Sequence, residues 1–482
     1  MVDNKINFIK LNKIFITWLI LLSTISCSNS YVDNIDAGEN YQYREGYPEL
    51  RLAATSYVSD DGESYLSIAV DLVYGSLVFK KNEDTYRSAG EFDISIVKQG
   101  DMPITVGNHS YPISITDKDY SIIESQETYL FEKEYVVDPG EYIVNVTYRD
   151  ASSTKSSTRS TETIVLDPGR VTSNSNLPNI RVLTKNLASD VTDYIPLTTY
   201  DFSSDTDSVK FAFQIVSQAS EESIVVESRL LKFESDTTYA RLMNERNYTP
   251  GNIAYKGIDY SEEVEISSSR RVITTNGNIL FEFSYPKLDR GNYRFEVFSN
   301  SSEETSFYKA RDFGVKSPNY PTLKSSRELA APLIYLMGEK EHDELMSIDN
   351  DLELKKSIDR FWLKNIKNKS KAKATISLFY ERVEEANKQF SNFKEGWKTD
   401  RGYIYILYGP PWNTEKYLQR IRWGYSHNSA EFEKNFYFEA SRIKNKYYPF
   451  DNFLLQRSRD YYQIHYQQVQ LWLSGLILAD NL

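Results

Sequence analysis

The sequence predicts a mainly β protein that ends in a smaller α+β domain. Three observations support this fold class. Residues 51–316 contain short runs in which apolar and polar residues alternate between turn-forming residues, and a period of two is typical of strands. One turn-and-strand segment within this part occurs twice. Beyond residue 316 the apolar residues recur at helical spacing, so the architecture is expected to change there.

Residues 51–168 are expected to form a first β-sandwich. Asp61-Gly62 lies between two strand-like runs, Ser56–Val58 and Tyr65–Val70, and this residue pair accepts the backbone conformation of a tight hairpin turn. Short strands with many turns and no helical period are typical of sandwiches. Further strands are predicted at Leu77–Phe79, Phe92–Val97, Tyr129–Tyr135 and Tyr142–Tyr148.

The repeat predicts that residues 178–316 form a second, related sandwich. Val137–Val146 (VDPGEYIVNV) aligns with Leu288–Val297 (LDRGNYRFEV), 151 residues later. In both copies an Asp-x-Gly turn leads into a strand, with a tyrosine two residues after the glycine. A turn followed by tyrosine often introduces a late strand in immunoglobulin-like and fibronectin-like sandwiches. We therefore predict two tandem β-sandwiches of this kind, with chance similarity between two hairpins as the alternative.

Residues 320–482 are expected to form the α+β domain, from three helices and a small sheet. Apolar residues recur at helical spacing within 322–346, from Leu352 to Ile366 and within 371–392. The apolar run Tyr403–Tyr408 is predicted to be a strand, stopped by Gly409-Pro410-Pro411. The other strand candidates are Glu433–Ala440, Asp460–Tyr466 and Val469–Leu473.

The N-terminus predicts an exported protein with a lipid anchor. Three lysines precede an apolar run of 12 residues, Ile14–Ile25, which is typical of a signal peptide and too short for a membrane-spanning helix. Thr24-Ile25-Ser26-Cys27 resembles a bacterial lipobox, and Cys27 is the only cysteine of the chain. We predict a lipoprotein signal peptide over 1–26, lipidation (palmitate included) at Cys27 and a tether over 27–50. The alternative is an ordinary signal peptide with a chance cysteine.

Charge and composition restrict the possible partners. Residues 28–316 carry 28 basic and 46 acidic residues, whereas residues 317–482 carry 25 and 21. The acidic part argues against nucleic acid, which needs a clustered basic face. The sequence has no GxGxxG motif or P-loop, so nucleotide binding has no support, and we expect no cofactor. We expect no thiol chemistry either, because the single cysteine is assigned to the lipid.

The stretch Phe390–Gly402 (FSNFKEGWKTDRG) resembles the signature of the GWxTD domain, which occurs in exported proteins of Bacteroidota and related bacteria. The resemblance extends upstream through Phe361-Trp362 and Arg382–Asn387, and downstream through Tyr403–Pro411, so that it covers about residues 320–480. It implies export in this lineage but no established activity. We expect the lipid-anchored protein to lie at the outer membrane. Ser28-Asn29-Ser30 lacks the acidic cluster expected of surface-exported lipoproteins, which favours the periplasmic face and leaves surface exposure open.

The motif residues have a structural and a functional interpretation. Gly396 and Gly402 are expected to bracket a sharp turn that needs the backbone freedom of glycine. Thr399 and Asp400 suit capping and turn positions. In the functional alternative, Trp397, Thr399, Asp400 and Arg401 form a turn that binds a ligand or a partner. A catalytic role for Asp400 is a third possibility.

No other pattern predicts catalysis or metal binding. The four histidines, His109, His342, His427 and His465, have no metal-binding spacing. A nucleophile–base–orienter arrangement from Asp400, Ser426 and a histidine lacks a GxSxG elbow. Asp349, Asp351 and Glu353 lack the glycine and terminal glutamate of a calcium loop, and a helix N-terminus explains them better.

These features together favour a non-enzymatic protein that binds other proteins. We expect an exported, lipid-anchored interaction or assembly module of a bacterial envelope complex, with protein partners in the envelope. Its binding surfaces are expected at the sandwich edges and at the turn around Trp397. The alternative is a hydrolase or carbohydrate-active envelope protein with its site in the C-terminal domain.

Overall fold

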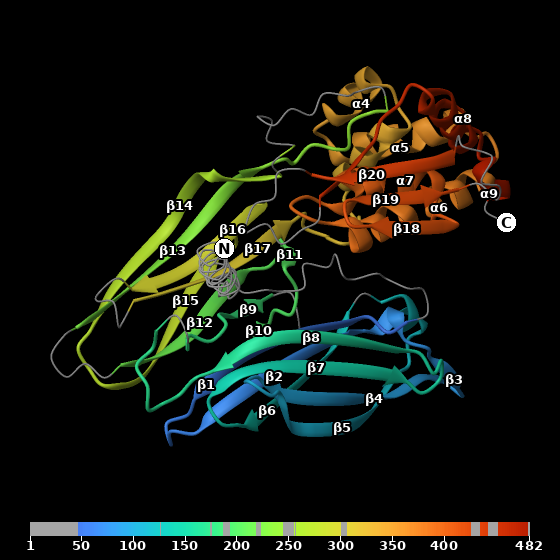
Figure 1. Ribbon diagram of the computed structural model, residues 1–482. Helices are drawn as coiled ribbons and strands as arrows, with labels where there is room; N and C mark the ends of the chain where they lie inside the picture. The colour runs from blue at the N-terminus through green and yellow to red at the C-terminus, as the bar shows by residue number, and fades with distance from the viewer. Residues whose placement is uncertain are drawn as a thin grey trace, which may run out of the picture.

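The computed structural model has three parts (Figure 1). Two β-sandwiches lie side by side, and an α+β domain packs on the end of the second one. The residues described are 47–125, 127–173, 176–186, 193–217, 223–243, 255, 257–299, 306–425, 434–441 and 452–480. The predicted signal peptide, Cys27, most of the tether, Ser426 and His427 lie outside this set.

Two antiparallel sheets form the first sandwich, as predicted. Leu66, Ile68, Phe92, Val144 and Val146 are buried between them. The predicted strand Leu77–Phe79 is wrong, because this segment only connects a 3-10 turn to the next strand. One sheet contains β1 (Leu50–Val58), β2 (Ser64–Val73) and β6 (Thr128–Val136), and the other contains β3 (Lys80–Asn82), β4 (Thr85–Lys98), β5 (Ile104–Asp117), β7 (Gly140–Asp150) and β8 (Ser156–Val165), with short 3-10 helices at η1 (Tyr74–Ser76) and η2 (Tyr120–Glu124).

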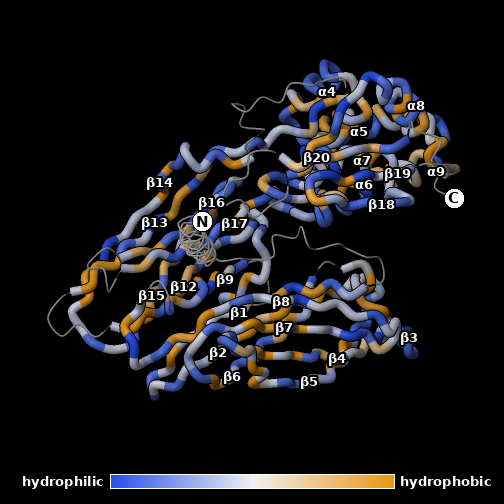
Figure 2. Tube along the Cα trace, viewed as in Figure 1, coloured by the Kyte–Doolittle hydropathy of each residue, from blue (hydrophilic) through white to orange (hydrophobic). Residues whose placement is uncertain are grey.

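The second sandwich has a core of stacked aromatic rings. The Phe211 and Phe295 ring centroids are 4.4 Å apart, and those of Phe213 and Phe281 are 5.1 Å apart. In Figure 2 apolar and polar stretches alternate along the strands of both sandwiches, as strands with one buried face require. One sheet has the order β10 (Ile195–Pro196), β9 (Arg181–Lys185), β12 (Ser208–Ser217), β15 (Gly277–Pro286), and the other has the order β11 (Asp201–Ser203), β17 (Phe307–Lys316), β16 (Gly291–Ser299), β13 (Ile224–Ser235), β14 (Ile258–Ile273).

The repeated turn-and-tyrosine segment has the same geometry in both sandwiches. The Tyr142 hydroxyl donates to the carbonyl of Asp138, and the Tyr293 hydroxyl donates to the carbonyl of Asp289, both at 2.7 Å. Each tyrosine therefore closes the turn before its own strand, which is the tyrosine corner of immunoglobulin-like sandwiches. The sequence repeat is a structural repeat.

Polar side chains fix the two sandwiches against each other. The Gln214 side chain accepts from the backbone N–H of Val58 at 2.6 Å and donates to its carbonyl at 2.9 Å. Asn179 donates to the carbonyls of Ala54 and Glu162 at 3.2 and 2.8 Å. Because these amides satisfy backbone groups across the joint, they favour one relative orientation of the sandwiches.

The C-terminal part combines helices with a four-stranded antiparallel sheet, as predicted. Its core gathers Trp362, Phe379, Trp472, Phe436 and Phe438. None of the described helices is long and apolar enough to cross a membrane. The elements are α3 (Ser326–Ala330), η3 (Ala331–Tyr335), α4 (Glu339–Met346), α5 (Asp351–Asn365), α6 (Lys369–Phe390), η4 (Gly396–Lys398), α7 (Asp400–Tyr408), β18 (Asn413–Tyr417), β19 (Arg420–Gly424), β20 (Asn435–Ala440), β21 (Phe453–Leu455), α8 (Tyr461–Ser474) and α9 (Ile477–Asp480).

Three strand predictions in this part are wrong. Tyr403–Tyr408 is the body of helix α7, and both Asp460–Tyr466 and Val469–Leu473 fall on helix α8 or its N-terminus. Helix α7 is apolar on every side because it is buried among α6, α8 and the sheet, so it lacks the stripe that marks a surface helix. A short apolar run of this kind does not distinguish a buried helix from a buried strand.

Candidate functional site

The two motif glycines allow three backbone segments to pack closely. A Cβ atom on Gly396 would lie 1.9 Å from the carbonyl oxygen of Ala386, and one on Gly402 would lie 1.9 Å from the carbonyl oxygen of Gly396. Neither residue has positive φ. Glycine is therefore required at both positions, as expected. The reason is the close approach of helices α6 and α7 to η4, and not the backbone freedom that was expected.

The Trp397 and Thr399 side chains both have contacts within the C-terminal part. Thr399 is the N-cap residue: its hydroxyl accepts from the N–H of Gly402 at 3.1 Å and donates to the carbonyl of Gly396 at 2.7 Å. The Trp397 ring is buried against Tyr335, whose hydroxyl donates to the Trp397 carbonyl at 2.8 Å. Both side chains are therefore occupied by contacts within the C-terminal part.

Asp400 forms a buried ion pair with Arg457 that joins three chain segments. Two guanidinium nitrogens of Arg457 donate to the two carboxylate oxygens at 2.8 and 2.7 Å. Asp400 also accepts from the N–H of Leu455 in β21 at 2.7 Å. Arg457 in turn donates to the carbonyls of Arg241 and Leu242, at 2.7 and 3.2 Å, in the segment that follows β13 of the second sandwich.

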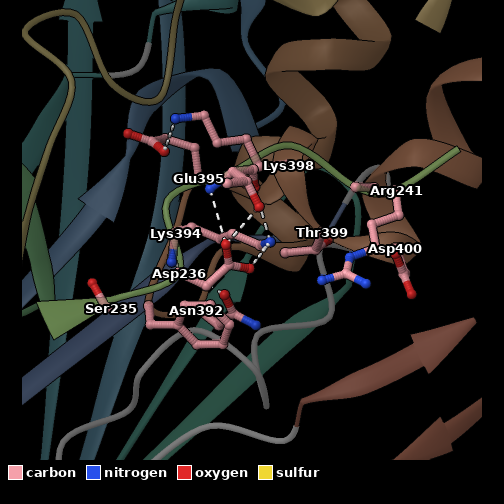
Figure 3. A network of polar contacts seen from close by, with 12 residues as sticks. Ser235, Asp236, Arg241, Asn392, Lys394, Glu395, Lys398, Thr399 and Asp400 are labelled. Atoms are coloured by element: carbon pink, nitrogen blue, oxygen red, sulfur yellow. Dashed lines mark hydrogen bonds and ion pairs between the residues drawn. The ribbon is translucent and has the colours of Figure 1, made fainter. Parts of the chain in front are cut away.

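The residues just before the Gly-Trp pair, residues 391–395, form a loop that inserts into the second sandwich and is called the plug loop (Figure 3). The Phe393 ring is buried in an apolar patch made by Leu231, Phe233 and Ile258 on the outer face of the sheet. The carbonyl of Phe393 accepts from the Asn292 side chain in β16 at 2.8 Å. Apolar insertion and a hydrogen bond from the Asn292 side chain to the Phe393 carbonyl together dock the loop.

A lysine and a glutamate of this loop form two further ion pairs across the same joint. The Lys394 ammonium binds the carboxylate of Asp236 and the carbonyl of Thr238, the latter at 2.9 Å. Burial raises the pKa of Asp236, but the charge and hydrogen bond of Lys394 and the hydrogen bonds of Thr238 together outweigh burial and lower the pKa. Buried charges of this kind persist only where they are paired.

Glu395 is held by two cations. Arg290 binds both carboxylate oxygens, and the Lys398 ammonium lies 3.0 Å from Oε2. Burial opposes ionisation of Glu395, but Lys398 and Arg290 together lower its pKa well below the ordinary range. Glu395 therefore stays ionised at any physiological pH.

A cavity of about 180 Å³ lies where all three parts of the chain meet. Burial raises the pKa of Asp201, at its wall, to about 6; the charge of Glu395 adds to this effect, and the Lys316 ammonium, 3.3 Å from Oδ1, opposes it. A carboxyl group that titrates near neutral pH beside a cavity is a candidate binding or acid–base group. The wall comprises Glu49–Arg51 and Arg159 from the first sandwich, Thr198–Ser203 from the second, and Tyr320, Pro321, Lys388 and Ser391 from the α+β part.

The family model of the GWxTD domain matches residues 292–474. The C-terminal part of this chain is a GWxTD domain. No curated protein matches the chain. Among solved structures, red sea bream transglutaminase aligns at 7% identity over 58% of this chain with a TM-score of 0.18. The chain spans 32% of the length of that structure, and a similarity this low carries no argument.

The GWxTD match begins well before residue 320, where the resemblance was expected to start. The additional residues include β16 and β17, two strands of the second sandwich. These strands supply Asn292 and Lys316, which bind the carbonyls of Phe393 and Asn392 in the plug loop. The residues that match the family model therefore include both the plug loop and the two sandwich strands that bind it.

The residues of the predicted binding turn are largely buried in the GWxTD domain. Trp397, Thr399 and Asp400 are covered, and the half-buried guanidinium of Arg401 lies over the rings of Phe390 and Phe453, at 5.3 and 5.5 Å. Binding of a ligand or partner at this turn stays a prediction. Of these four residues, only Arg401 is exposed enough to contact a ligand or a partner directly.

The described histidines and acidic residues are dispersed. His342 bonds the carbonyl of Ala331, His465 contacts the hydroxyl of Tyr403, and His109 stacks on Tyr135 in the first sandwich. Burial lowers the pKa of His465 to about 4, so its ring is neutral at pH 7. Asp351 and Glu353 lie in the first turn of α5, as expected, with Asp349 just before it. Within the described ranges no three His, Cys, Asp or Glu side chains gather as metal ligands.

The charged residues that join the domains are not among the candidate site residues predicted from the sequence. Lys394 and Glu395 stand within the motif stretch, but their partners Asp236 and Arg290 lie 158 and 105 residues away. A Lys-Glu pair in a loop is usually solvated. The one indication in the sequence is that the Lys394-Glu395 pair follows Phe393, because an apolar residue at that position suggests that the loop is buried.

Proposed function

We propose that this protein is an exported, lipid-anchored interaction module of a bacterial envelope complex, attached to the outer membrane through Cys27. The observation that carries this proposal is the use of the GWxTD motif. The polar residues in and beside this motif form a helix cap and an ion pair within the GWxTD domain, and ion pairs that join it to the second sandwich. Residues used in this way support a rigid scaffold that holds binding surfaces at fixed positions.

The exposed sheet edges are the proposed partner surfaces. Strand β14 ends its sheet in the strand order, and β5 pairs only with β4 among the described strands. Both carry exposed apolar side chains, including Val264 and Ile266 on β14 and Ile104 on β5. Unpaired strand edges with apolar side chains are ready templates for an added strand of a partner.

The test is recovery of the complex from its native envelope. The tagged, lipidated chain and a Cys27→Ala form would be purified in mild detergent. A stoichiometric partner that is lost when Val264 and Ile266 are both changed to Lys, with the fold retained, supports the assembly role. Recovery of the chain alone from a fully solubilised membrane contradicts it.

A hydrolase or carbohydrate-active protein is the second candidate, and the cavity favours it. Asp201 has a pKa suited to proton transfer near neutral pH. The cavity lies at the junction of the domains rather than within the GWxTD domain. Turnover of any envelope polysaccharide or peptide that disappears in Asp201→Asn would favour this candidate.

A further inference from the structure

The hairpin between β18 and β19 ends in an exposed apolar tip. Tyr417 and Arg420 pair across the turn, and Leu418 and Gln419 form the turn itself. The Leu418 side chain is 94% exposed and that of Tyr417 is 57% exposed. A leucine in this position buries nothing within the chain.

Turn chemistry does not account for this leucine either. Two-residue hairpin turns favour Gly, Asn or Asp, and neither Leu418 nor Gln419 has positive φ. Two other hairpin turns of the described chain use polar pairs that suit a turn. These pairs are Asp61-Gly62 and Glu83-Asp84.

The tip carries a small net positive charge. Strands β18 and β19 carry Lys416, Arg420 and Arg422 against Glu415. Arg420 pairs with Glu439 at 3.0 Å and Arg422 pairs with Glu415, so Lys416 supplies the net charge of +1. Arg420 and Arg422 also line a shallow hollow beside Leu418. An apolar wedge with an aromatic residue and flanking cations has the composition of segments that bind a membrane interface.

The size of the patch favours a lipid surface over a protein. A stable protein interface needs about 800 Å² on each partner, which one hairpin tip does not provide. A membrane contact can be weaker, because an anchored protein meets the lipid at high effective concentration. Cys27 and Tyr47 are 20 positions apart in the sequence, so at ~3.5 Å per position the chain between them reaches at most ~70 Å.

We propose that Tyr417–Arg420 is a second membrane contact, which inserts Leu418 into an anionic phospholipid surface while Lys416 meets the phosphates. The charge distribution agrees with this orientation. The sandwich part is strongly acidic and the C-terminal part mildly basic, so an anionic surface attracts the GWxTD end of the molecule and repels the other. The contribution of the Cys27 lipid to this contact rests on the proposed function, whereas the affinity of the hairpin tip for anionic phospholipid does not.

The experiment uses the chain from Ser28 to Leu482, which retains every described residue and contains no cysteine. A single cysteine at Leu418→Cys would carry an environment-sensitive fluorophore. Met102→Cys is the matched control, because Met102 is also an exposed apolar residue (80%) in a hairpin loop, on the acidic first sandwich. Vesicles of phosphatidylethanolamine with phosphatidylglycerol are compared with vesicles of phosphatidylcholine.

We expect a blue shift and brighter fluorescence at position 418 with the anionic vesicles only, reduced by high salt, and no change at position 102. Leu418→Asp should weaken sedimentation with these vesicles about tenfold. An unchanged signal at position 418, or equal signals at both positions, overturns the proposal. Because the protein in this experiment carries no lipid, a negative vesicle result does not contradict the proposed assembly role of the anchored protein. A negative pull-down result likewise does not contradict the membrane contact of the hairpin tip.

Discussion

At the scale of single residues, Asp400 shows how a motif residue can hold chain segments together. Its carboxylate is buried and makes three charge-assisted contacts, two with Arg457 and one with the N–H of Leu455. Removing one partner of a buried ion pair costs more than the pair contributes, because the other charge remains buried. The aspartate of the motif is therefore explained by stability alone.

We predict that Asp400→Asn lowers the free energy of unfolding by about 3–5 kcal/mol, because it leaves the Arg457 charge buried without its partner. Urea unfolding followed by circular dichroism measures this loss. The matched control is Asp359→Asn, which breaks the exposed pair with Lys355 and should cost less than about 1 kcal/mol. Equal effects of the two substitutions would contradict the structural role of Asp400.

At the scale of elements, helix α7 depends on its N-cap. The Thr399 hydroxyl both accepts from the N–H of Gly402 and donates to the carbonyl of Gly396. We predict that Thr399→Ala destabilises the protein by about 1–2 kcal/mol, as other N-cap losses do. Thr399→Ser keeps the hydroxyl and should restore most of the stability. If serine and alanine were equally destabilising in the same urea titration, the methyl group rather than the cap would matter.

The same helix shows where prediction from sequence ends. The Thr399 cap and the Gly409 stop are both visible in the sequence, and Gly409 has φ of 79° at the C-cap. Yet the apolar run between them has no helical stripe, since burial on all sides removes the periodicity on which helix prediction depends. The helices α5 and α6 each have one exposed face and were predicted correctly.

Contacts between distant segments were not predictable at all. The tyrosine corners could be inferred, because a tyrosine and its acceptor lie four residues apart. The partners of Asp400 and Lys394 lie 57 and 158 residues away, and nothing local marks them. Sequence reasoning thus recovered the domains' fold class but not the joint between them.

At the scale of the whole molecule, the three-domain junction is expected to respond to pH through Asp201. Its pKa is raised to about 6, so the folded state binds this proton more tightly than the unfolded chain does. This carboxyl therefore costs stability at neutral pH, and the cost disappears as pH falls from about 7 toward 4.

We predict that the stability difference between wild type and Asp201→Asn changes by about 1–2 kcal/mol between about pH 7 and about pH 5, in favour of wild type at the lower pH. Urea titrations at several pH values measure it. Asp205→Asn, which removes an exposed carboxylate, is the matched control. Curves for Asp201→Asn parallel to those of wild type would show that its pKa is ordinary.

The plug loop should make the second sandwich and the GWxTD domain unfold together. Phe393 is the loop's large apolar contact with the sandwich, and truncating a buried phenylalanine costs about 3–5 kcal/mol. We therefore predict that Phe393→Ala splits one calorimetric transition into two, because the remaining ion pairs lose the apolar cover that excludes water from them. Phe390→Ala is the matched control, since Phe390 packs on Tyr405 and Trp423 within the GWxTD domain. It should shift the transition without dividing it. If Phe393→Ala only shifted the transition too, the coupling would reside in the ion pairs of Lys394 and Glu395.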